Sequence, residues 1–406
     1  MIKSDYGIMP QMKAKNVLAL VTSSSQARIR GIARYAKSAG WNLMLENQLA
    51  HGPRGWRGDG VLVTLKDTPA VIGYIDRLRK LGIPVVNLTG SYSPAGLPSV
   101  TGDNTRIGEL AAEHFRDRAF RHVAWFSTNG NRIQHQRADA FAHAWKRRCP
   151  GLDAPQRFIW SESSSAHKRD DWSQQSKWLS ACLRSAPKPL GVFCYSDYDA
   201  SHVLGICRDN GIDVPREVAV LGVDDNEVIC ENQSVPLSSV RHDLEQVGYT
   251  GAELLDRLMK KKGSGIGDRG SGQLPTTILI PPKGVTTRRS TDTTAVADPE
   301  LAEALRIIER RLRKPLGAAQ IADEMGIPRI RLDRLFAREL GTSVGREILR
   351  QRMVAAKGLL RDTDLTLDEI ASRTGFCNAG YLANTFRREV GVTPGRYRSS
   401  TAGCCR

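Results

Sequence analysis

The sequence lacks several features that would assign it to a common protein class. Its longest apolar stretches, such as residues 16–21 and 60–65, have only the length of a strand, whereas a membrane-spanning helix needs roughly 20 apolar residues. The first ten residues, MIKSDYGIMP, contain neither the apolar core nor the small-residue cleavage site of a secretory signal. We therefore expect a cytoplasmic protein that has no contact with a membrane.

The eight cysteines indicate neither a metal site nor a disulfide framework. They never form a C-x-x-C pair, and none lies at zinc-ligand spacing from a histidine. The vicinal pair Cys404 and Cys405 lies in a polar tail, where a frayed chain end is the simpler interpretation. We expect reduced thiols and no bound metal.

Catalytic motifs are missing as well. The chain contains no H-E-x-x-H, no G-x-S-x-G, no Walker loop, and no G-x-G-x-x-G after a strand. The run Gly-Ser-Gly-Ile-Gly at 263–267 follows a helical pattern and three lysines, which is typical of a surface loop. We expect a protein that is not an enzyme and needs no cofactor.

The chain is long and basic. Its 406 residues exceed the size of a single hydrophobic core, so two or three domains are expected. Lys and Arg total 59 against 43 Asp and Glu, which gives a formal net charge of +16. Such a charge favours a polyanionic partner or an acidic surface, and does not choose between them.

Residues 15–288 alternate short apolar, β-branched runs with segments of helical period. This pattern is typical of parallel strands joined by crossover helices. The expected strands lie at 16–21, 41–46, 60–64, 84–88, 122–126, 190–194 and 219–223, with helices between them. Because there are too many strands for one tidy sheet, we expect an α/β domain of two similar lobes.

A change of composition marks the end of this domain. Residues 289–298 are small and polar, and we interpret them as an interdomain linker. Asp298, Pro299 and Glu300 then provide an N-cap, a proline for the first helical position and an acidic first turn. No strand pattern follows, so residues 299–400 are expected to form an all-α domain.

Two parts of this helical region repeat each other. Each consists of a short helix with a small residue, a turn that contains glycine, and a second helix, over 318–338 and 367–388. The matched positions are Ala322 with Ala371, Leu332 with Leu382, and Phe336 with Phe386. Residues 344–361 keep a helical apolar spacing and would hold the two helix-turn-helix units at a fixed separation.

The second helix of each unit fits the width of a DNA major groove. Between 328 and 361 there are nine basic and three acidic residues, which suits contacts with phosphates. For each arginine, a base contact, a phosphate contact and a solvated face stay open, with Arg331 and Arg334 the first choices for guanine and Asn384 for adenine. The candidate DNA-binding residues are Arg329, Ile330, Arg331, Asp333, Arg334, Arg338, Asn378, Ala379, Gly380, Tyr381, Asn384 and Arg387.

The helical region resembles the DNA-binding domain of the AraC/XylS family of transcription activators. The resemblance covers residues 318–398, about a fifth of the chain. Its motifs here are Arg338-Glu339-Leu340-Gly341, Glu369-Ile370-Ala371, Gly375-Phe376 and the closing run 391–398, GVTPGRYR. One departure is Pro328, where such proteins often place a serine cap. The resemblance implies a sequence-specific regulator that binds double-stranded DNA at repeated half-sites.

Residues 15–288 resemble the sugar-binding core of lactose-repressor-type regulators, which is related to type I periplasmic binding proteins. The resemblance rests on segments such as DNTRIG at 103–108, RADAF at 137–141 and VLGVDD at 220–225. It implies a sugar site formed by Ser23, Ser24, Asp103, Arg137, Trp172, Ser196, Asp224 and Asp225. Alternatives stay open: Asp103 as a helix cap, Trp172 as a packing residue, and one of Asp224 and Asp225 as a structural group.

Together the two resemblances imply a regulator whose DNA-bound state is switched by a small sugar effector, a pentose and in the first place xylose. They also imply a homodimer and contact with RNA polymerase. A repressor of the same genes, or a sensor domain with another ligand or none, are the alternatives. A transport binding protein is excluded, since it would need export and no helical tail.

Overall fold

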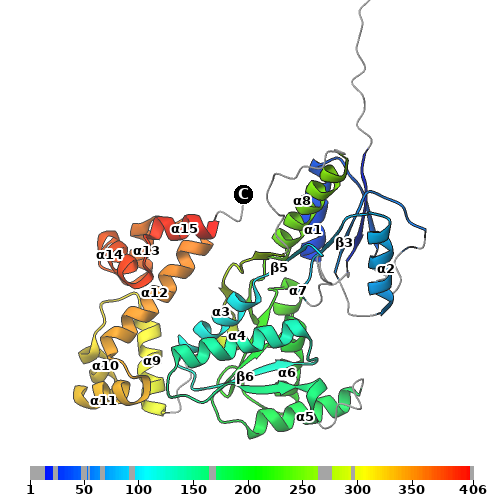
Figure 1. Cartoon of the computed structure of the whole chain (residues 1–406). Coiled ribbons are helices and arrows are strands. Elements are labelled where there is room, and N and C mark those ends of the chain that lie inside the picture. Colours follow the sequence, from blue (N-terminus) through cyan, green and yellow to red (C-terminus); the bar gives the residue numbers. More distant parts are fainter. Residues whose placement is uncertain are drawn as a thin grey trace, which may run out of the picture.

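The computed structural model describes residues 14–21, 26–46, 53, 55–64, 69–90, 97–163, 171–263, 277–293 and 298–402. It consists of an α/β half built from two lobes, followed by a helical domain (Figure 1). The expected fold class, a bilobal periplasmic-binding-protein-like domain followed by an all-α domain, is confirmed. Ser23, Ser24 and the Cys404–Cys405 pair lie outside the described residues.

The N-lobe contains a six-stranded sheet whose strands are all parallel, in the order β11-β5-β4-β3-β1-β2. Strands such as β1 and β3 are apolar and almost fully buried, because helices cover both faces of a parallel sheet. The strands are β1 (Asn16–Leu20), β2 (Asn42–Glu46), β3 (Gly60–Val63), β4 (Val85–Asn87), β5 (Ser99–Gly102) and β11 (Thr277–Ile280). Helices α1 (Gln26–Ser38), α2 (Pro69–Lys80) and α8 (Leu244–Gly263) pack against them.

The C-lobe repeats this design around a second six-stranded sheet, in the order β12-β10-β9-β8-β6-β7, with only β12 antiparallel. Its strands are β6 (His122–Ser127), β7 (Gln156–Ile159), β8 (Leu190–Cys194), β9 (Val218–Val223), β10 (Ser238–Val240) and β12 (Val285–Thr286). Its helices are α3 (Asn104–Arg116), α4 (Arg132–Arg148), η1 (Trp160–Glu162), α5 (Trp172–Ser185), α6 (Asp197–Asp209) and α7 (Glu227–Cys230).

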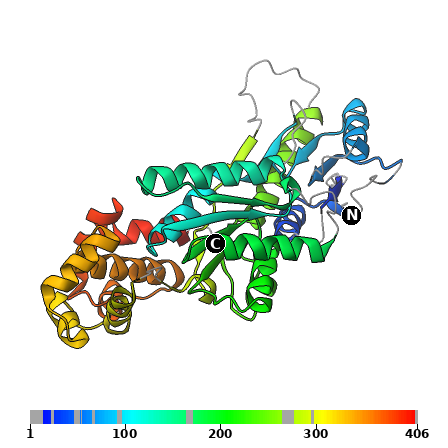
Figure 2. The same ribbon diagram turned by 90° about the horizontal axis from the view of Figure 1, so that it is seen from below.

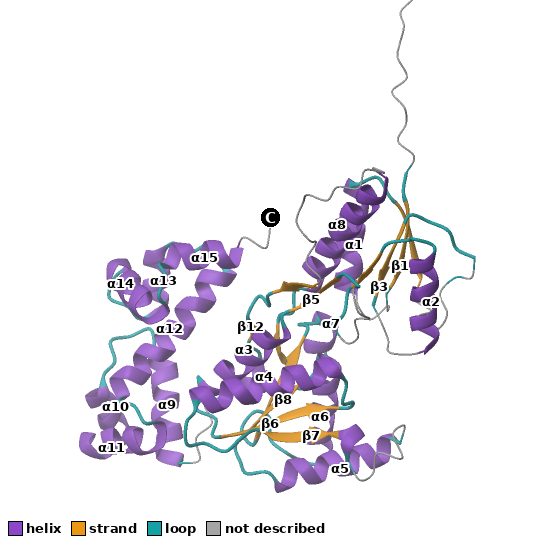
Figure 3. Ribbon diagram, in the orientation of Figure 1, coloured by secondary structure: helices purple, strands orange, loops and turns teal. Residues whose placement is uncertain are grey.

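Three segments connect the lobes (Figure 3). They join β5 to α3, β10 to α8, and β11 to β12. The segments hold each other through backbone bonds: the Asp103 amide donates to the Ile280 carbonyl at 2.8 Å, and the Arg241 amide donates to the Gly284 carbonyl at 2.8 Å. Because both sheets end at these crossings, the loops beyond the strand ends of the two lobes face each other.

The helical domain lies beside the C-lobe, near the ends of α3 and α4, and away from β1–β3 (Figure 1 and Figure 2). Its helices are α9 (Pro299–Arg311), α10 (Ala318–Met325), α11 (Arg329–Leu340), α12 (Val344–Asp362), α13 (Leu367–Thr374), α14 (Ala379–Val390) and α15 (Pro394–Ala402). Asp298 caps α9 by accepting from the amides of Glu300 and Leu301. A 3-10 turn, η3 (Arg289–Thr291), packs on the C-lobe before this domain begins.

Within the described part of the chain, none of the helices is long and apolar enough to cross a membrane.

Candidate functional site

Arg137, which is expected at the sugar site, is a buried cation. The side chain belongs to α4 and is only 5% exposed. Its Nε donates to Oδ1 of Asn104 at 2.7 Å and its Nη1 to the Tyr195 carbonyl at 2.7 Å, while the guanidinium carbon lies 4.9 Å from the centre of the Tyr195 ring. These contacts fix the orientation of a buried charge, so the group is held ready for a polar ligand.

Asp224, which lies beside His242, brings charge of the opposite sign close to Arg137. His242 Nδ1 lies 3.0 Å from Asp224 Oδ1, and the side chains are 7% and 33% exposed. Burial would raise the pKa of Asp224, but the hydrogen bond with His242 and the charges of Arg137 and Arg28 outweigh it and lower that pKa. Because Arg28 is on α1 of the N-lobe and Asp224 is in the C-lobe, the cluster includes groups from both lobes.

The protonation state of this pair follows from its surroundings. Burial is the main cause that lowers the pKa of His242, and it outweighs the opposing effect of Asp224. At neutral pH the carboxylate is therefore ionised and the imidazole neutral, with its proton on Nδ1. His242 Nε2 is then an acceptor; it is buried against Gly102 and has no hydrogen-bond partner among the described residues.

Asp225 faces away from this cluster. Its Oδ1 accepts from Nη1 of Arg288 at 2.8 Å, and its Oδ2 accepts from the Thr286 hydroxyl at 2.6 Å. Asp224 and Asp225 have φ angles of 109° and 54°, which residues other than glycine adopt only at a cost of about 1–3 kcal/mol each. The two neighbouring carboxylates thus serve different surfaces, Asp224 the crevice and Asp225 the segment that leads to the helical domain.

Three other residues expected at the sugar site also have structural partners. Asp103 caps α3, since its Oδ1 accepts from the Arg106 amide at 2.9 Å. Ser196 caps α6 and donates to Asp199 Oδ2 at 2.8 Å. Trp172, at the start of α5, is 55% exposed and packs edge to face on His202.

The sequence reasoning missed Arg28, Tyr195 and His242. Arg28 lies in the first turn of α1, close in sequence to the predicted Ser23 and Ser24. Tyr195 directly precedes the predicted Ser196, and His242 lies two residues after the end of the short polar strand β10 (Ser238–Val240). Their positions in the sequence could have identified them. Each follows a strand end or lies in the first turn of the next helix, where ligand-binding residues lie in such sheets.

In the helical domain, the two helix-turn-helix units have separate cores. Ile321, Leu332 and Phe336 are buried in the first, and Ile370, Leu382 and Phe386 in the second. Helix α12 supplies residues to both cores, Val344 and Ile348 at one end and Met353, Ala356 and Leu360 at the other. At 1.5 Å per residue its 19 residues measure about 28 Å, and this single helix holds both units.

The exposed basic side chains of α11 fall into two groups. Arg331 and Arg338 are paired with acidic residues at the start of the domain, Arg331 with Glu300 and Arg338 with Asp298. Arg329 lies 3.5 Å from Asp333 on the same helix. For Arg334, which is also exposed, no ion pair is found among the described residues. Arg334 and the 67% exposed Ile330 therefore form the open face of α11.

Helix α14 presents a less charged surface. Asn378 is its N-cap, and its Oδ1 accepts from the Tyr381 amide at 2.8 Å. Tyr381 is 51% exposed and packs against Phe376, while Asn384 lies in the middle of the helix on the surface side, opposite the buried Leu382 and Phe386. The residues expected to bind DNA thus lie on or at the start of the second helix of each unit.

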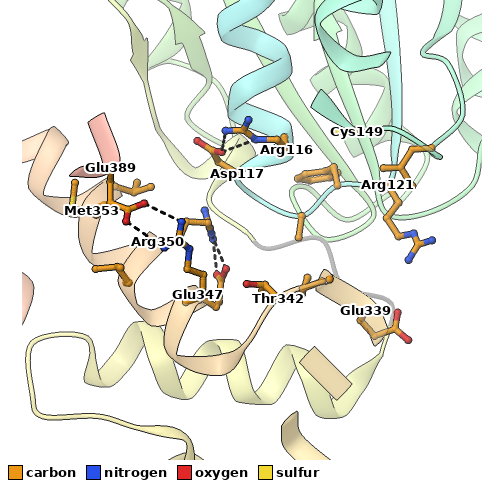
Figure 4. A pocket seen from close by; sticks show the side chains of 18 of the residues that line it. Arg116, Asp117, Arg121, Cys149, Glu339, Thr342, Glu347, Arg350, Met353 and Glu389 are labelled. Atoms are coloured by element: carbon orange, nitrogen blue, oxygen red, sulfur yellow. Dashed lines mark hydrogen bonds and ion pairs between the residues drawn. The ribbon is translucent and has the colours of Figure 1, made fainter. Parts of the chain in front are cut away.

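A cleft of about 700 Å³ separates the C-lobe from the helical domain (Figure 4). One wall carries Arg116, Asp117 and Arg121 from the end of α3 and the following turn, and the other carries Glu347 and Arg350 from α12. The charges pair within each wall, Arg116 with Asp117 and Arg350 with Glu347, each at 2.6 Å.

Comparisons with known proteins agree with this division into two parts. Residues 112–291 match the periplasmic binding protein-like domain, and residues 321–400 match a helix-turn-helix domain. The Xylose operon regulatory protein of Haemophilus influenzae is 26% identical over 382 residues, which cover 91% of this chain and 94% of that protein. The chain is a DNA-binding transcription regulator that combines a periplasmic-binding-protein-like sensor domain with a helix-turn-helix domain.

Further relatives support this assignment of the regulator. The Xylose operon regulatory protein of Escherichia coli is 27% identical over 383 residues, covering 91% of this chain and 92% of that protein. The solved structure of a xylose-binding transcription activator, xylR, aligns with a TM-score of 0.57 and 25% identity over 96% of this chain and 99% of that chain. These relatives are named as regulators of transcription and not as enzymes, which agrees with the absence of catalytic motifs.

The sensor half alone also has structural neighbours. A LacI family transcriptional regulator from Enterococcus faecium, solved with bound ribose, has a TM-score of 0.53 and 21% identity and covers 70% of this chain and all of that chain. At this identity the similarity shows the shared fold of the sensor domain.

Proposed function

We propose that this regulator activates sugar catabolic genes in response to a pentose, with xylose as the first candidate. The observation that carries the proposal is the cluster of Arg28, Arg137 and Asp224 between two hinged lobes, in the same chain as two helix-turn-helix units. The full-length similarity to proteins named for the xylose operon and for xylose binding supports the choice of sugar.

The chemistry of the crevice suits a small neutral polyol. A carboxylate such as that of Asp224 accepts from two vicinal hydroxyl groups, and the guanidinium of Arg137 donates to ring or hydroxyl oxygens. The indole of Trp172 offers an apolar face to C–H bonds. Asp103, Ser196, Ser23 and Ser24 complete the proposed site, and His242 adds a buried acceptor.

The proposed response is closure of the lobes around the sugar, which shifts the population of arrangements of the helical domains in a homodimer. Each protomer would place α11 and α14 in successive major grooves. Because the single helix α12 holds both units and successive grooves on one face of DNA lie about 34 Å apart, we expect binding to bend the DNA. The regulator would act in the cytoplasm and contact RNA polymerase.

A melting-temperature screen of the full chain against pentoses and hexoses tests the sensor. A sugar present at about 100 times its Kd stabilises the folded state by about 2.7 kcal/mol. D-xylose is expected to give the largest upward shift, and Asp224→Asn should abolish it. A screen in which no sugar raises the melting temperature would contradict the proposal.

The DNA half of the proposal is tested with sequences that the full chain selects from a random library. Two copies of a half-site about one helical turn apart are expected for each protomer. Transcription with purified RNA polymerase then distinguishes activation from repression, because an activator raises the yield of transcript only when sugar is present.

A further inference from the structure

The Asp225–Arg288 ion pair links the crevice to the segment that leads into the DNA-binding domain. Nη1 of Arg288 lies 2.8 Å from Oδ1 of Asp225, and the two side chains are 14% and 17% exposed. Arg288 Nε also donates to Glu231, and its Nη1 donates to the Leu237 carbonyl at 3.0 Å. The pair is thus withdrawn from solvent and oriented on both sides, unlike an exposed ion pair, which contributes little.

Arg288 is also fixed through its backbone. The hydroxyl of Ser238, which is fully buried at the start of β10, accepts from the Arg288 amide and donates to the Arg288 carbonyl, both at 2.8 Å. A shift of Asp225 therefore cannot be absorbed by rotation of a loose side chain. It must be transmitted to the main chain at residue 288.

The next residues continue the connection. Ser290 and Thr291 are fully buried; Ser290 donates to the Val220 carbonyl of β9 at 2.6 Å, and Thr291 donates to the Ser238 hydroxyl at 2.7 Å. The Thr291 hydroxyl also lies 2.8 Å from Nε2 of His114, and Arg118 donates to the Thr291 carbonyl at 2.8 Å. His114 belongs to the last turn of α3 and Arg118 to the turn that follows it, and the neighbouring residues Arg116 and Asp117 line the cleft to the helical domain.

The crevice end of this connection is under backbone strain. Asp224 and Asp225 are consecutive residues with positive φ angles, held there by His242 on one side and by Thr286 and Arg288 on the other. Strained residues of this kind persist only where their surroundings fix them, and they are typical of switch regions. A ligand bound to the Asp224 carboxylate acts on the same short peptide segment that carries Asp225.

We propose that Arg288 is a positioning residue that transmits the state of the crevice, through Asp225, to the linker and so to the DNA-binding domain. The inference rests on the proposed sugar response. It assigns the response to one buried ion pair. It predicts that, when this pair is removed, the protein still binds sugar but sugar no longer changes the affinity for DNA.

The test compares full-length wild-type protein, Arg288→Gln and Arg289→Gln. Arg289 is the matched control, because it is the exposed neighbour in the same segment and its loss changes the net charge equally. The probe is D-xylose, or the pentose that shifts the wild-type melting temperature most. Three quantities are measured: the sugar-induced melting shift, the ratio of DNA dissociation constants with and without sugar, and sugar-induced hydrogen exchange in residues 286–293.

In the wild type and in Arg289→Gln, sugar is expected to change the DNA dissociation constant by a factor of about 5 to 150, the usual range of allosteric coupling. In Arg288→Gln the ratio is expected within about twofold of 1, with the sugar-induced melting shift retained and the exchange response of residues 286–293 lost. A purely structural role would instead reduce sugar binding itself.

A ratio in Arg288→Gln equal to that of the wild type overturns the inference. If Arg288→Gln does not fold, Arg288→Lys is measured; it keeps the charge but loses the forked geometry. A reduced ratio in that variant supports the inference and an unchanged one overturns it. A wild type in which no sugar shifts either the melting temperature or DNA binding overturns the proposed function, and the inference with it.

Discussion

Arg331 and Glu300 form a double contact between the first recognition helix and the first turn of the domain: Nη2 lies 2.5 Å from Oε1 and Nε lies 3.1 Å from Oε2. Arg338 makes a single contact with Asp298, at 2.9 Å. Of the arginines expected to read bases, Arg331 is therefore already engaged by a carboxylate, whereas Arg334 is exposed and has no ion pair among the described residues. This difference separates their predicted roles.

Arg334→Ala is expected to weaken binding to the selected operator by about 1–3 kcal/mol while affecting random DNA little, because a bidentate arginine–guanine contact carries sequence information. Titrations of both DNAs at one salt concentration measure this. Arg338→Ala is the control and should weaken both alike. Equal losses on both DNAs for Arg334→Ala would refute a base-reading role.

Glu300→Gln is expected to tighten binding to random DNA, because it removes a carboxylate that competes with phosphates for Arg331. The plot of log affinity against log salt should become steeper by up to about one phosphate contact, a change in slope of about 0.9. Glu303→Gln is the control, since Glu303 pairs with Arg306 on the same helix and not with α11. An unchanged slope would show that Arg331 does not reach the DNA backbone.

The turn glycines of the two helix-turn-helix units are expected to differ in how much stability is lost when each is replaced by alanine. Gly326 and Gly375 have φ angles of 65° and 79°, but a Cβ would meet nothing within 4 Å at Gly326 and would lie 2.1 Å from the Leu312 carbonyl oxygen at Gly375. Gly326→Ala should cost about 1–2 kcal/mol, the cost of a left-handed residue. Gly375→Ala should cost about 1–3 kcal/mol more, because backbone must shift. Urea denaturation of the full chain measures both, and equal costs would contradict the predicted clash.

The stability of the chain is expected to depend on pH through His114. Burial, with a smaller effect from Arg118, holds the pKa of His114 well below its ordinary value of 6.5. The unfolded chain then binds a proton that the folded chain does not, so stability is complete above about pH 6.5 and falls below it by about 1.4 kcal/mol per pH unit.

Unfolding free energies at pH 7.5 and pH 5.5 test this, with His114→Gln as the comparison. Between these values the wild type is expected to lose about 1.4 kcal/mol more than His114→Gln. The difference between the two proteins removes the contributions of the other buried histidines. An identical pH dependence would show that His114 is protonated without cost in the folded state.

Much of the fold could be predicted from the sequence, because strand-length apolar runs and helical periods report burial directly. The expected strands at 60–64 and 190–194 correspond to β3 and β8. The short strands β5 and β10 were not predicted, since Ser-Val-Thr-Gly and Ser-Ser-Val carry no apolar pattern. Each is buried because it has a neighbouring strand on both sides, which is a property of the tertiary structure.

The sites were harder to predict than the fold. The resemblance to lactose-repressor-type regulators, together with the positions of the strand ends, selected Arg137 and Asp224, and the structure brings these two residues into one electrostatic cluster. The sequence could not show that Asp225 turns toward Arg288, because 63 residues separate the pair. It also could not show that Arg331 and Arg338 meet the acidic start of α9, since that contact depends on how the helices cross.

Gly102 lies where the two lobes meet, and a Cβ there would come within 1.9 Å of Nε2 of His242. The space beside Gly102 therefore accommodates only a hydrogen atom in place of a side chain. We expect the added methyl group of Gly102→Ala to push the imidazole away from Asp224 and to hinder closure of the lobes. We expect such a protein to lose the proposed response to sugar while the side chains expected to bind DNA are unchanged.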